Sequence, residues 1–370
     1  MKKVLSILLI IVIMATYAGC QLFDSNRKNL EYDGIVIGPN KNAMVEDSGY
    51  IADPAYYQFA IVYGGEHPYF MPYEPGAKAA AEDLGIVDPY IVSPQAWDQV
   101  EQNKVLDEVI AKGAVGIAMF PSNADAGNEQ ITKMVNNNIP VVTLGGSPSE
   151  PSDAVFCFAT DVGASVALGT QKLIDKLKEN GLTQGNIVHL CSALGDTNTQ
   201  KRQAAITEVL ARPENEGFVL YKELADTDVI EHAEREISIM YASYIDEVDG
   251  IICTGYVNAQ VLAKTMMAVD ETRVVAIGID DSKEVLDAID AGVMYGTMTQ
   301  NPWGMGYVGV YALKLLQDGY TYKKEKGFFI DSGYYLLTKE GLPTYQETIE
   351  AKTKEFVSTM KEKYFNPPAQ

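Results

Sequence analysis

A repeated alternation between short apolar runs and amphipathic stretches constrains the fold of this chain more than any other feature of its sequence. From Tyr57 onward, each apolar run is followed by Gly, Pro or Asn and then by a stretch with helical periodicity. This order predicts βαβ units and a parallel sheet. The apolar runs are nearly continuous in Val, Ile and Ala, as expected for strands covered on both faces. The predicted strands are 58–63, 116–120, 140–144, 185–190, 250–253, 274–279 and 294–299.

The amphipathic stretches predict helices that end near Gly, Asn or Pro. They are 76–84, 96–112, 128–137, 164–178, 199–211, 229–246, 259–269 and 283–290. Such alternation over about 310 residues exceeds one comfortable domain, so we expect two lobes. The tail from Tyr345 to Phe365 is predicted to form a further, charged amphipathic helix.

The N-terminus has the layout of an export signal, because two lysines precede an apolar run over 4–14 that is too short to span a bilayer comfortably. The following segment 17–20 resembles a bacterial lipobox, which implies cleavage of a signal peptide 1–19 and acylation of Cys20. Tyr17 stands where a lipobox usually has Leu, so an ordinary secretory signal with an incidental cysteine is the alternative. Residues 20–56 are polar and aperiodic, and they are interpreted as a tether between lipid anchor and folded domain.

Charge and cysteine content narrow the possible partners. The formal net charge of −21 argues against nucleic acid as a partner. With Cys20 assigned to lipid, Cys157, Cys191 and Cys253 remain, each beside apolar residues. An odd number implies no disulfide framework, so these three cysteines are predicted to be small core residues.

The order of several motifs resembles that of the ribose-type periplasmic sugar-binding proteins, the type I solute-binding proteins of ABC transporters. The similar segments are the strand-loop-helix at 66–70 and 75–85, the strand at 139–144, Asn198 with Arg202, the turn at 278–280, the hinge motif at 299–306 and the closing strand at 331–339. The resemblance covers roughly Tyr57 to Tyr345.

The resemblance implies a fold class: α/β, with two Rossmann-like, doubly wound lobes joined by a three-stranded hinge. The hinge crossings would fall near Thr160, Gln300 and Ser332. The first lobe would comprise 57–160 with 301–332, the second 161–300 with 333–345, and 346–370 would form a helical extension. Such lobes close around a ligand by a hinge motion.

Sugars combine hydroxyl groups with apolar ring faces, so charged planar side chains and aromatic rings suit their binding. By resemblance, the ligand-binding residues would be His67, Tyr69, Phe70, Gly145, Arg202, Tyr256, Asp280 and Gln300. The first three would lie in the loop after the first strand, at the carboxyl edge of the sheet. Core packing is the alternative for Tyr69 and Phe70, and a surface position beside proline is the alternative for His67.

The second-lobe candidates also have alternatives. Asp280 could instead cap the helix that begins near Lys283, although Asp281 and Ser282 could cap it as well. Arg202 could form a salt bridge between the lobes. Gln300 could form a hinge hydrogen bond.

The sequence departs from the ribose-type pattern at positions that would contact the ligand. Gly145 and Gly146 replace an Asp-Arg pair, Tyr256 lies where an Asn-Asp pair is usual, and Thr227 replaces an aromatic residue. Ribose and galactose are therefore not supported as ligands. We expect a ligand with fewer hydroxyls toward the first lobe, or a larger one that stacks on Tyr256, and the two glycine amides could donate to it.

The sequence predicts a binding protein and not an enzyme, since no nucleophile with an adjacent base is evident. The spelling of 304–309 matches a dinucleotide fingerprint, but the acidic residue that would bind a ribose is missing, so we interpret these glycines as helix-packing positions. The histidines are far apart in sequence and suggest no metal centre, and no cofactor is expected. The predicted function is an extracytoplasmic receptor, held at the membrane by its lipid, that delivers a small polar solute, a sugar by resemblance, to an ABC permease. The alternative is a ligand sensor that signals to a chemoreceptor or histidine kinase.

Overall fold

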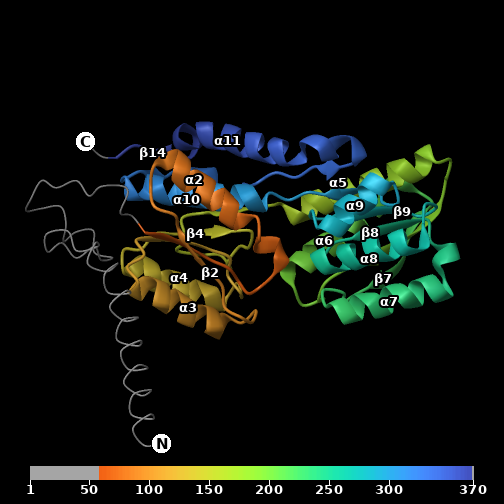
Figure 1. Cartoon of the computed structure of the whole chain (residues 1–370), viewed down its shortest axis with the longest axis horizontal. Helices are drawn as coiled ribbons and strands as arrows, with labels where there is room; N and C mark the ends of the chain where they lie inside the picture. The colour runs from red at the N-terminus through yellow and green to blue at the C-terminus, as the bar shows by residue number, and fades with distance from the viewer. Residues whose placement is uncertain (1–57, 369–370) are drawn as a thin grey trace, which may run out of the picture. The chain divides into compact units, whose positions relative to one another are not determined.

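The computed structural model describes residues 58–368 (Figure 1). The predicted signal peptide, Cys20 and the tether lie outside these residues. Two six-stranded sheets and the helices that cover them make up most of the described chain. Among residues 58–368, no helix is both long and apolar enough to cross a membrane.

The first sheet is entirely parallel and has the strand order β12-β5-β4-β3-β1-β2. Its strands are β1 (Phe59–Val62), β2 (Tyr90–Val92), β3 (Gly116–Met119), β4 (Val141–Leu144), β5 (Cys157–Ala159) and β12 (Phe329–Asp331). Every residue of β1, β3 and β4 is buried. This burial explains why their sequences are continuously apolar.

Helices cover both faces of the first sheet. One buried cluster joins it to α2 (Tyr73–Leu84), α10 (Pro302–Gln317) and α11 (Tyr345–Tyr364). A second cluster joins its other face to α3 (Gln99–Ala111) and α4 (Ala126–Asn136). Helices α2 and α10 approach closely, because a Cβ at Gly76 would lie 1.9 Å from the Trp303 carbonyl oxygen and one at Gly306 2.1 Å from that of Tyr73. The prediction that the glycines in 304–309 serve helix packing is thus confirmed for Gly306.

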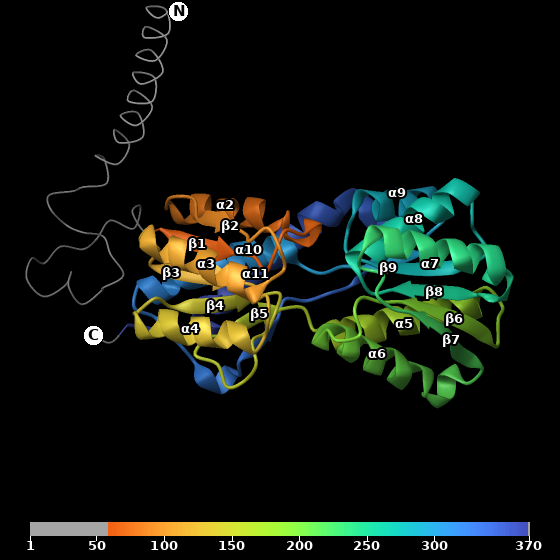
Figure 2. The same ribbon diagram turned by 90° about the horizontal axis from the view of Figure 1, so that it is seen from below.

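The second sheet has the strand order β13-β10-β9-β8-β6-β7 and is parallel except for β13. Its strands are β6 (Gly185–Leu190), β7 (Phe218–Leu224), β8 (Gly250–Cys253), β9 (Val275–Ile279), β10 (Gly296–Met298) and β13 (Leu336–Leu337). One face is covered by α5 (Val162–Glu179) and α6 (Thr197–Leu210), and the other by α7 (Ile230–Ser243), α8 (Tyr256–Val269) and α9 (Lys283–Ala291) (Figure 2).

The chain passes between the sheets after β5, after β10 and after β12. The first and third passages lie together, because the hydroxyl oxygens of Thr160 and Ser332 are 3.0 Å apart and the Asp161 amide donates to Asp331 at 3.1 Å. Gln300 lies in the second passage. The predicted fold class is confirmed, whereas the residue boundaries of the lobes stay a prediction. Below, the first and second lobes are the elements around the first and second sheets.

All seven predicted strands and all eight predicted helices are present, with ends shifted by a few residues. Strands β2, β5, β7 and β12 were not predicted, whereas β13 lies within the closing strand that the resemblance implied at 331–339. The tail forms the predicted helix, α11. The short strand β14 (Phe365–Asn366) follows it and pairs antiparallel with β11 (Thr321–Tyr322), which comes after α10 in the chain. Cys157, Cys191 and Cys253 are free and buried, as predicted.

Candidate ligand-binding site

A cavity of about 530 Å³ is lined by residues of both lobes. The first lobe contributes the loops after β1, β2, β3 and β4, and the second lobe those after β6, β7, β8, β9 and β10. All of these loops follow the carboxyl ends of parallel strands, where open α/β sheets bind ligands. Its size is within the range of small-molecule sites.

Seven of the eight predicted binding residues line this cavity: His67, Tyr69, Gly145, Arg202, Tyr256, Asp280 and Gln300. The eighth, Phe70, is only 1% exposed, does not line the cavity and belongs to the first-lobe core. Its ring stacks on Tyr63 with the centroids 4.6 Å apart. The core-packing alternative thus describes Phe70, whereas its neighbour Tyr69 reaches the cavity.

Asp280 follows β9 and is 7% exposed, with a left-handed backbone at φ 64°. Ser282 caps α9 by accepting from the Val285 amide, so the capping alternative does not describe Asp280. The Gln300 side-chain amide donates to Asp280 Oδ1 at 2.7 Å. Burial raises the pKa of Asp280 to about 7, and the bond from Gln300 opposes this rise. The carboxyl group is held out of water beside a cavity, at a point where a ligand hydroxyl could reach it.

Arg202 lies on α6 and lines the cavity. Its Nε is buried and has no hydrogen-bond partner. Burial lowers the pKa of Arg202, and the charge of Asp280 opposes this effect. A buried N–H without a partner is costly, so an acceptor that enters the cavity would satisfy a donor that the protein leaves open. Among the described residues, Arg202 forms no salt bridge between the lobes.

The Tyr69 hydroxyl connects the first lobe to this pair. It donates to Gln300 Oε1 at 3.5 Å, and the Met305 sulfur lies 3.3 Å away. Burial raises the pKa of Tyr69 well above its usual value, so the phenol stays protonated and can donate. Tyr69, Gln300 and Asp280 therefore form a hydrogen-bonded chain from one lobe through the hinge to the other.

Aromatic rings from both lobes meet at the cavity. The rings of His67 and Tyr256 are in edge-to-face contact with their centroids 5.7 Å apart. His67 Nδ1 accepts the Tyr69 amide at 3.1 Å, and burial lowers the pKa of His67, so its imidazole is neutral at pH 7 with the proton on Nε2. Trp97 was not predicted as a binding residue. Its ring centroid lies 6.3 Å from that of His67, and its side chain is half exposed.

Gly145 and Gly146 contact the ring of Phe120, another residue that sequence reasoning missed. A Cβ at Gly146 would lie 2.8 Å from two carbons of this ring, and one at Gly145 would lie 3.1 Å from it and 2.5 Å from the Tyr73 hydroxyl. Gly145 also has φ 73°. Backbone conformation and close contacts therefore both demand glycine at 145, and the Phe120 ring fills the space that a side chain at 146 would need.

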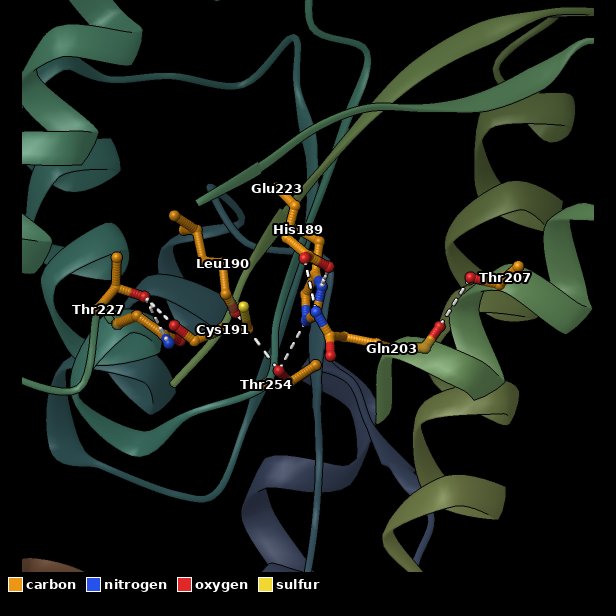
Figure 3. Close-up of polar contacts among 9 residues, drawn as sticks. His189, Leu190, Cys191, Gln203, Thr207, Glu223, Thr227 and Thr254 are labelled. Atoms are coloured by element: carbon orange, nitrogen blue, oxygen red, sulfur yellow. Dashed lines mark hydrogen bonds and ion pairs between the residues drawn. The ribbon is translucent and has the colours of Figure 1, made fainter. Parts of the chain in front are cut away.

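A polar network supports the second-lobe side of the cavity (Figure 3). His189 Nδ1 lies 2.9 Å from Glu223 Oε2, and His189 Nε2 lies 2.8 Å from the hydroxyl of Thr254, which lines the cavity. Gln203 also donates to Glu223, at 2.6 Å. The bond from His189 lowers the pKa of Glu223, so the carboxylate is ionised and accepts from Nδ1–H. His189 Nε2 then accepts from Thr254, whose oxygen can still accept from a ligand.

His189, Cys191 and Glu223 also place potential metal ligands within 4.8 Å of one another. Both ring nitrogens of His189 already make hydrogen bonds. Burial raises the pKa of Cys191 to about 12, which keeps the thiol protonated. The arrangement fits a hydrogen-bonded core network, and the expectation of no metal site stays a prediction.

Two parallel α/β lobes with a cavity at the carboxyl ends of both sheets define a two-lobed ligand-binding protein. Comparison with protein families agrees: the model described as "Periplasmic binding protein domain" matches residues 59–321. The chain belongs to this family.

Curated relatives in the family are named for sugars or a polyol. The chain is 24% identical over 264 residues to the D-apiose import binding protein of Actinobacillus succinogenes, covering 70% of this chain and 82% of the relative. It is 23% identical over 259 residues to the D-allose-binding periplasmic protein of Escherichia coli, covering 68% and 80%. The xylitol-binding protein of Mycolicibacterium smegmatis is 24% identical over 266 residues, covering 72% and 73%.

Solved structures share the fold. An ABC transporter solute-binding protein of Burkholderia graminis in complex with D-arabinose superimposes with a TM-score of 0.69 at 21% identity, covering 80% of this chain and 99% of that one. A glucose-galactose binding protein from Geobacillus stearothermophilus gives a TM-score of 0.65 at 23% identity, covering 78% and 99%.

Proposed function

We propose that the protein binds a sugar or a related polar solute between its lobes and delivers it to an ABC permease. The observation that carries the proposal is the buried, unpartnered Nε of Arg202 in a cavity shared with the Asp280–Gln300 pair. A single ligand hydroxyl can accept a hydrogen bond from Arg202 and donate one to Asp280. In the absence of a ligand, only an ordered water molecule could make both bonds. The names of the relatives support a sugar or polyol as the solute.

Ligand binding would close the lobes around the hinge passages, with 57–160 and 301–332 moving against 161–300 and 333–345. In that state Tyr69 and Tyr256 would exclude water from the ligand. The hydrogen bonds of Arg202 and Asp280 would then act in a less polar environment, where they are stronger.

A thermal-shift screen against sugars, polyols and nucleosides tests binding, because a ligand of the folded state alone raises the Tm. Asp280→Ala should weaken calorimetric binding of any hit by about 30-fold, as expected when one partner of a buried charged hydrogen bond is removed. Phe329→Ala serves as a matched control, since Phe329 is exposed on β12 and does not line the cavity. Unchanged affinity in a folded Asp280→Ala variant would contradict the assigned site.

Membrane attachment through Cys20 is the second part of the proposal. The charged and apolar start of the chain, followed by the segment 17–20, supports it. Cys20→Ser should release the exported protein from the membrane fraction, and a variant that stays as firmly bound as the parent would contradict it.

Delivery to a permease predicts that deleting the gene lowers uptake of the labelled ligand, whereas normal uptake with a lost chemotactic or kinase response would favour the sensor alternative.

A further inference from the structure

The two sides of the cavity differ in chemistry. The second lobe contributes ionisable side chains, among them Arg202, Asp228 and Asp280. Beyond the β1 loop, the first lobe lines the cavity with rings, small side chains and glycines and with no ionisable group. We call this surface the aromatic wall: Trp97, Phe120, Pro121, Ser122, Ala124, Gly145, Gly146 and Ser147. The first lobe's ionisable lining residues, Glu66 and His67, lie in the β1 loop, so a ligand that faces the aromatic wall meets no charged side chain there.

The side-chain hydrogen-bond donors of the aromatic wall are already used within the protein. The Trp97 indole N–H donates to the Ser122 carbonyl oxygen at 3.0 Å. The Ser122 hydroxyl donates to the Gly64 carbonyl oxygen at 2.6 Å, and the Ser147 hydroxyl to that of Pro148 at 3.2 Å. A ligand hydroxyl that faces this wall would lose water without gaining a side-chain donor.

The position of Phe120 is fixed by its neighbours. Gln102 is fully buried and its Nε2 donates to the carbonyl oxygens of Phe120 at 2.7 Å and Tyr63 at 2.8 Å. The Phe120 ring packs edge to face against both Phe70 and Trp97, with centroids 5.3 Å apart in each pair. These contacts hold the Phe120 ring in place. The ring therefore presents an apolar surface to the ligand at the ends of β3 and β4.

We propose that the aromatic wall selects a sugar with an apolar edge, meaning a deoxy or O-methylated sugar, over its fully hydroxylated counterpart. This inference rests on the proposed function. The apolar edge would lie against Trp97 and Phe120, while the remaining hydroxyls would bond to Arg202 and Asp280. A hydroxyl added toward an apolar pocket lowers affinity by up to about a hundredfold. We therefore expect at least a tenfold preference within a matched pair.

Calorimetric titration of the signal-free chain with matched pairs tests the selectivity. Suitable pairs are L-fucose with L-galactose, L-rhamnose with L-mannose, and O-methylated glucose with glucose. The expected result is tenfold tighter binding of the apolar member in at least one pair. Trp97→Ala should reduce that preference, and Phe329→Ala should leave it unchanged. Sugar binding with no such preference in any pair would overturn the inference and leave the proposed function intact, and binding of no sugar at all would overturn both.

A double variant tests the geometry directly. Phe120→Ala removes the ring that lies 2.8 Å from a Cβ at Gly146, so Gly146→Asp fits in its background. The double variant should shift the preference toward the hydroxylated member of the same pair, because the new carboxylate can accept its hydroxyl. Gly146→Asp alone should lower the Tm through its clash with Phe120. A double variant that is folded by circular dichroism and keeps the parent's preference would refute the role of Phe120.

Discussion

The buried carboxyl of Asp280 should make the protein less stable at alkaline pH, and Asp280→Asn should remove this effect. Asparagine keeps the acceptor for Gln300 and tolerates the left-handed backbone at φ 64° better than most residues do. The substitution therefore removes a charge without creating a cavity or backbone strain. It should also weaken ligand binding, because an NH2 group replaces the second carboxylate oxygen and cannot accept a hydrogen bond from a ligand hydroxyl.

Burial raises the pKa of Asp280 from 3.8 to about 7. The folded protein therefore binds more protons than the unfolded chain between these values, and stability falls as pH rises through that window. Each unit of pKa shift corresponds to about 1.4 kcal/mol of stability. The buried carboxylate therefore lowers the free energy of unfolding by about 4 kcal/mol above pH 7. Well below pH 3.8 the carboxyl is protonated in both states, and its burial no longer affects stability.

Urea unfolding of the parent and of Asp280→Asn between pH 4 and pH 8.5 provides the measurement. The stability of the variant relative to the parent should increase with pH by about 4 kcal/mol and then level off above pH 7. Asp228→Asn, which changes an exposed carboxylate at the same cavity, should show no comparable increase. A pH-independent difference for Asp280→Asn would mean that the carboxylate is ionised in the fold without penalty, and the reasoning would be wrong.

Three further substitutions, the last with a control variant, test other parts of the structure. Arg202→Lys should raise the Kd for any hit at least tenfold by calorimetry, since a lysine ammonium cannot reproduce the planar fork of donors, and an unchanged Kd would exclude a guanidinium contact. Gln102→Leu should cost about 2–4 kcal/mol in urea unfolding, because it leaves buried backbone groups of the β1 and β3 loops unsatisfied. Met360→Ala should lower the free energy of unfolding by about 2–5 kcal/mol, because Met360 is fully buried on α11. As a control on the same helix, Glu355→Ala changes an exposed residue and should alter this free energy by about 0.5 kcal/mol or less.

The strands that were predicted are those whose burial is visible in the sequence. Strands β1, β3 and β4 are covered on both faces, so each is a continuous apolar run. Strand β7 was missed because it lies at the edge of its sheet and exposes several side chains, which breaks the run. Strands β2, β5 and β12 have three residues each, too few for any periodicity to stand out.

The site was predictable where a motif follows a strand, and less so where contact depends on side-chain direction. Asp280 and Gln300 follow β9 and β10, so their placement at the carboxyl edge comes from topology alone. Tyr69 and Phe70 are adjacent, and only the 3-10 helix η4 (Pro68–Phe70) decides which of them faces the cavity. Trp97 lies beyond the unpredicted strand β2, in a loop without a motif, so no local signal pointed to it.

The glycine pair shows how a departure from a family pattern can be noticed in sequence and explained only in space. The missing Asp-Arg pair predicts fewer polar contacts from the first lobe, with the two glycine amides as replacement donors. In the structure the Gly145 amide donates to the Phe158 carbonyl oxygen at 3.0 Å, within the sheet. The space beside the pair holds the Phe120 ring, which comes from the end of a different strand.

Helix α11 lies beyond the matched family region, which ends at residue 321, yet it contacts both lobes. At its start, the Tyr345 hydroxyl donates to Asp281 at 2.8 Å, one residue from the buried carboxyl of Asp280. Further along, Thr353 accepts from the hinge residue Asn301 at 2.9 Å, and Lys354 pairs with Asp83 of α2 at 2.9 Å. Because these contacts join the ligand-side loop, the hinge and the first lobe, α11 is a structural part of the two-lobed fold and not an appendage to it.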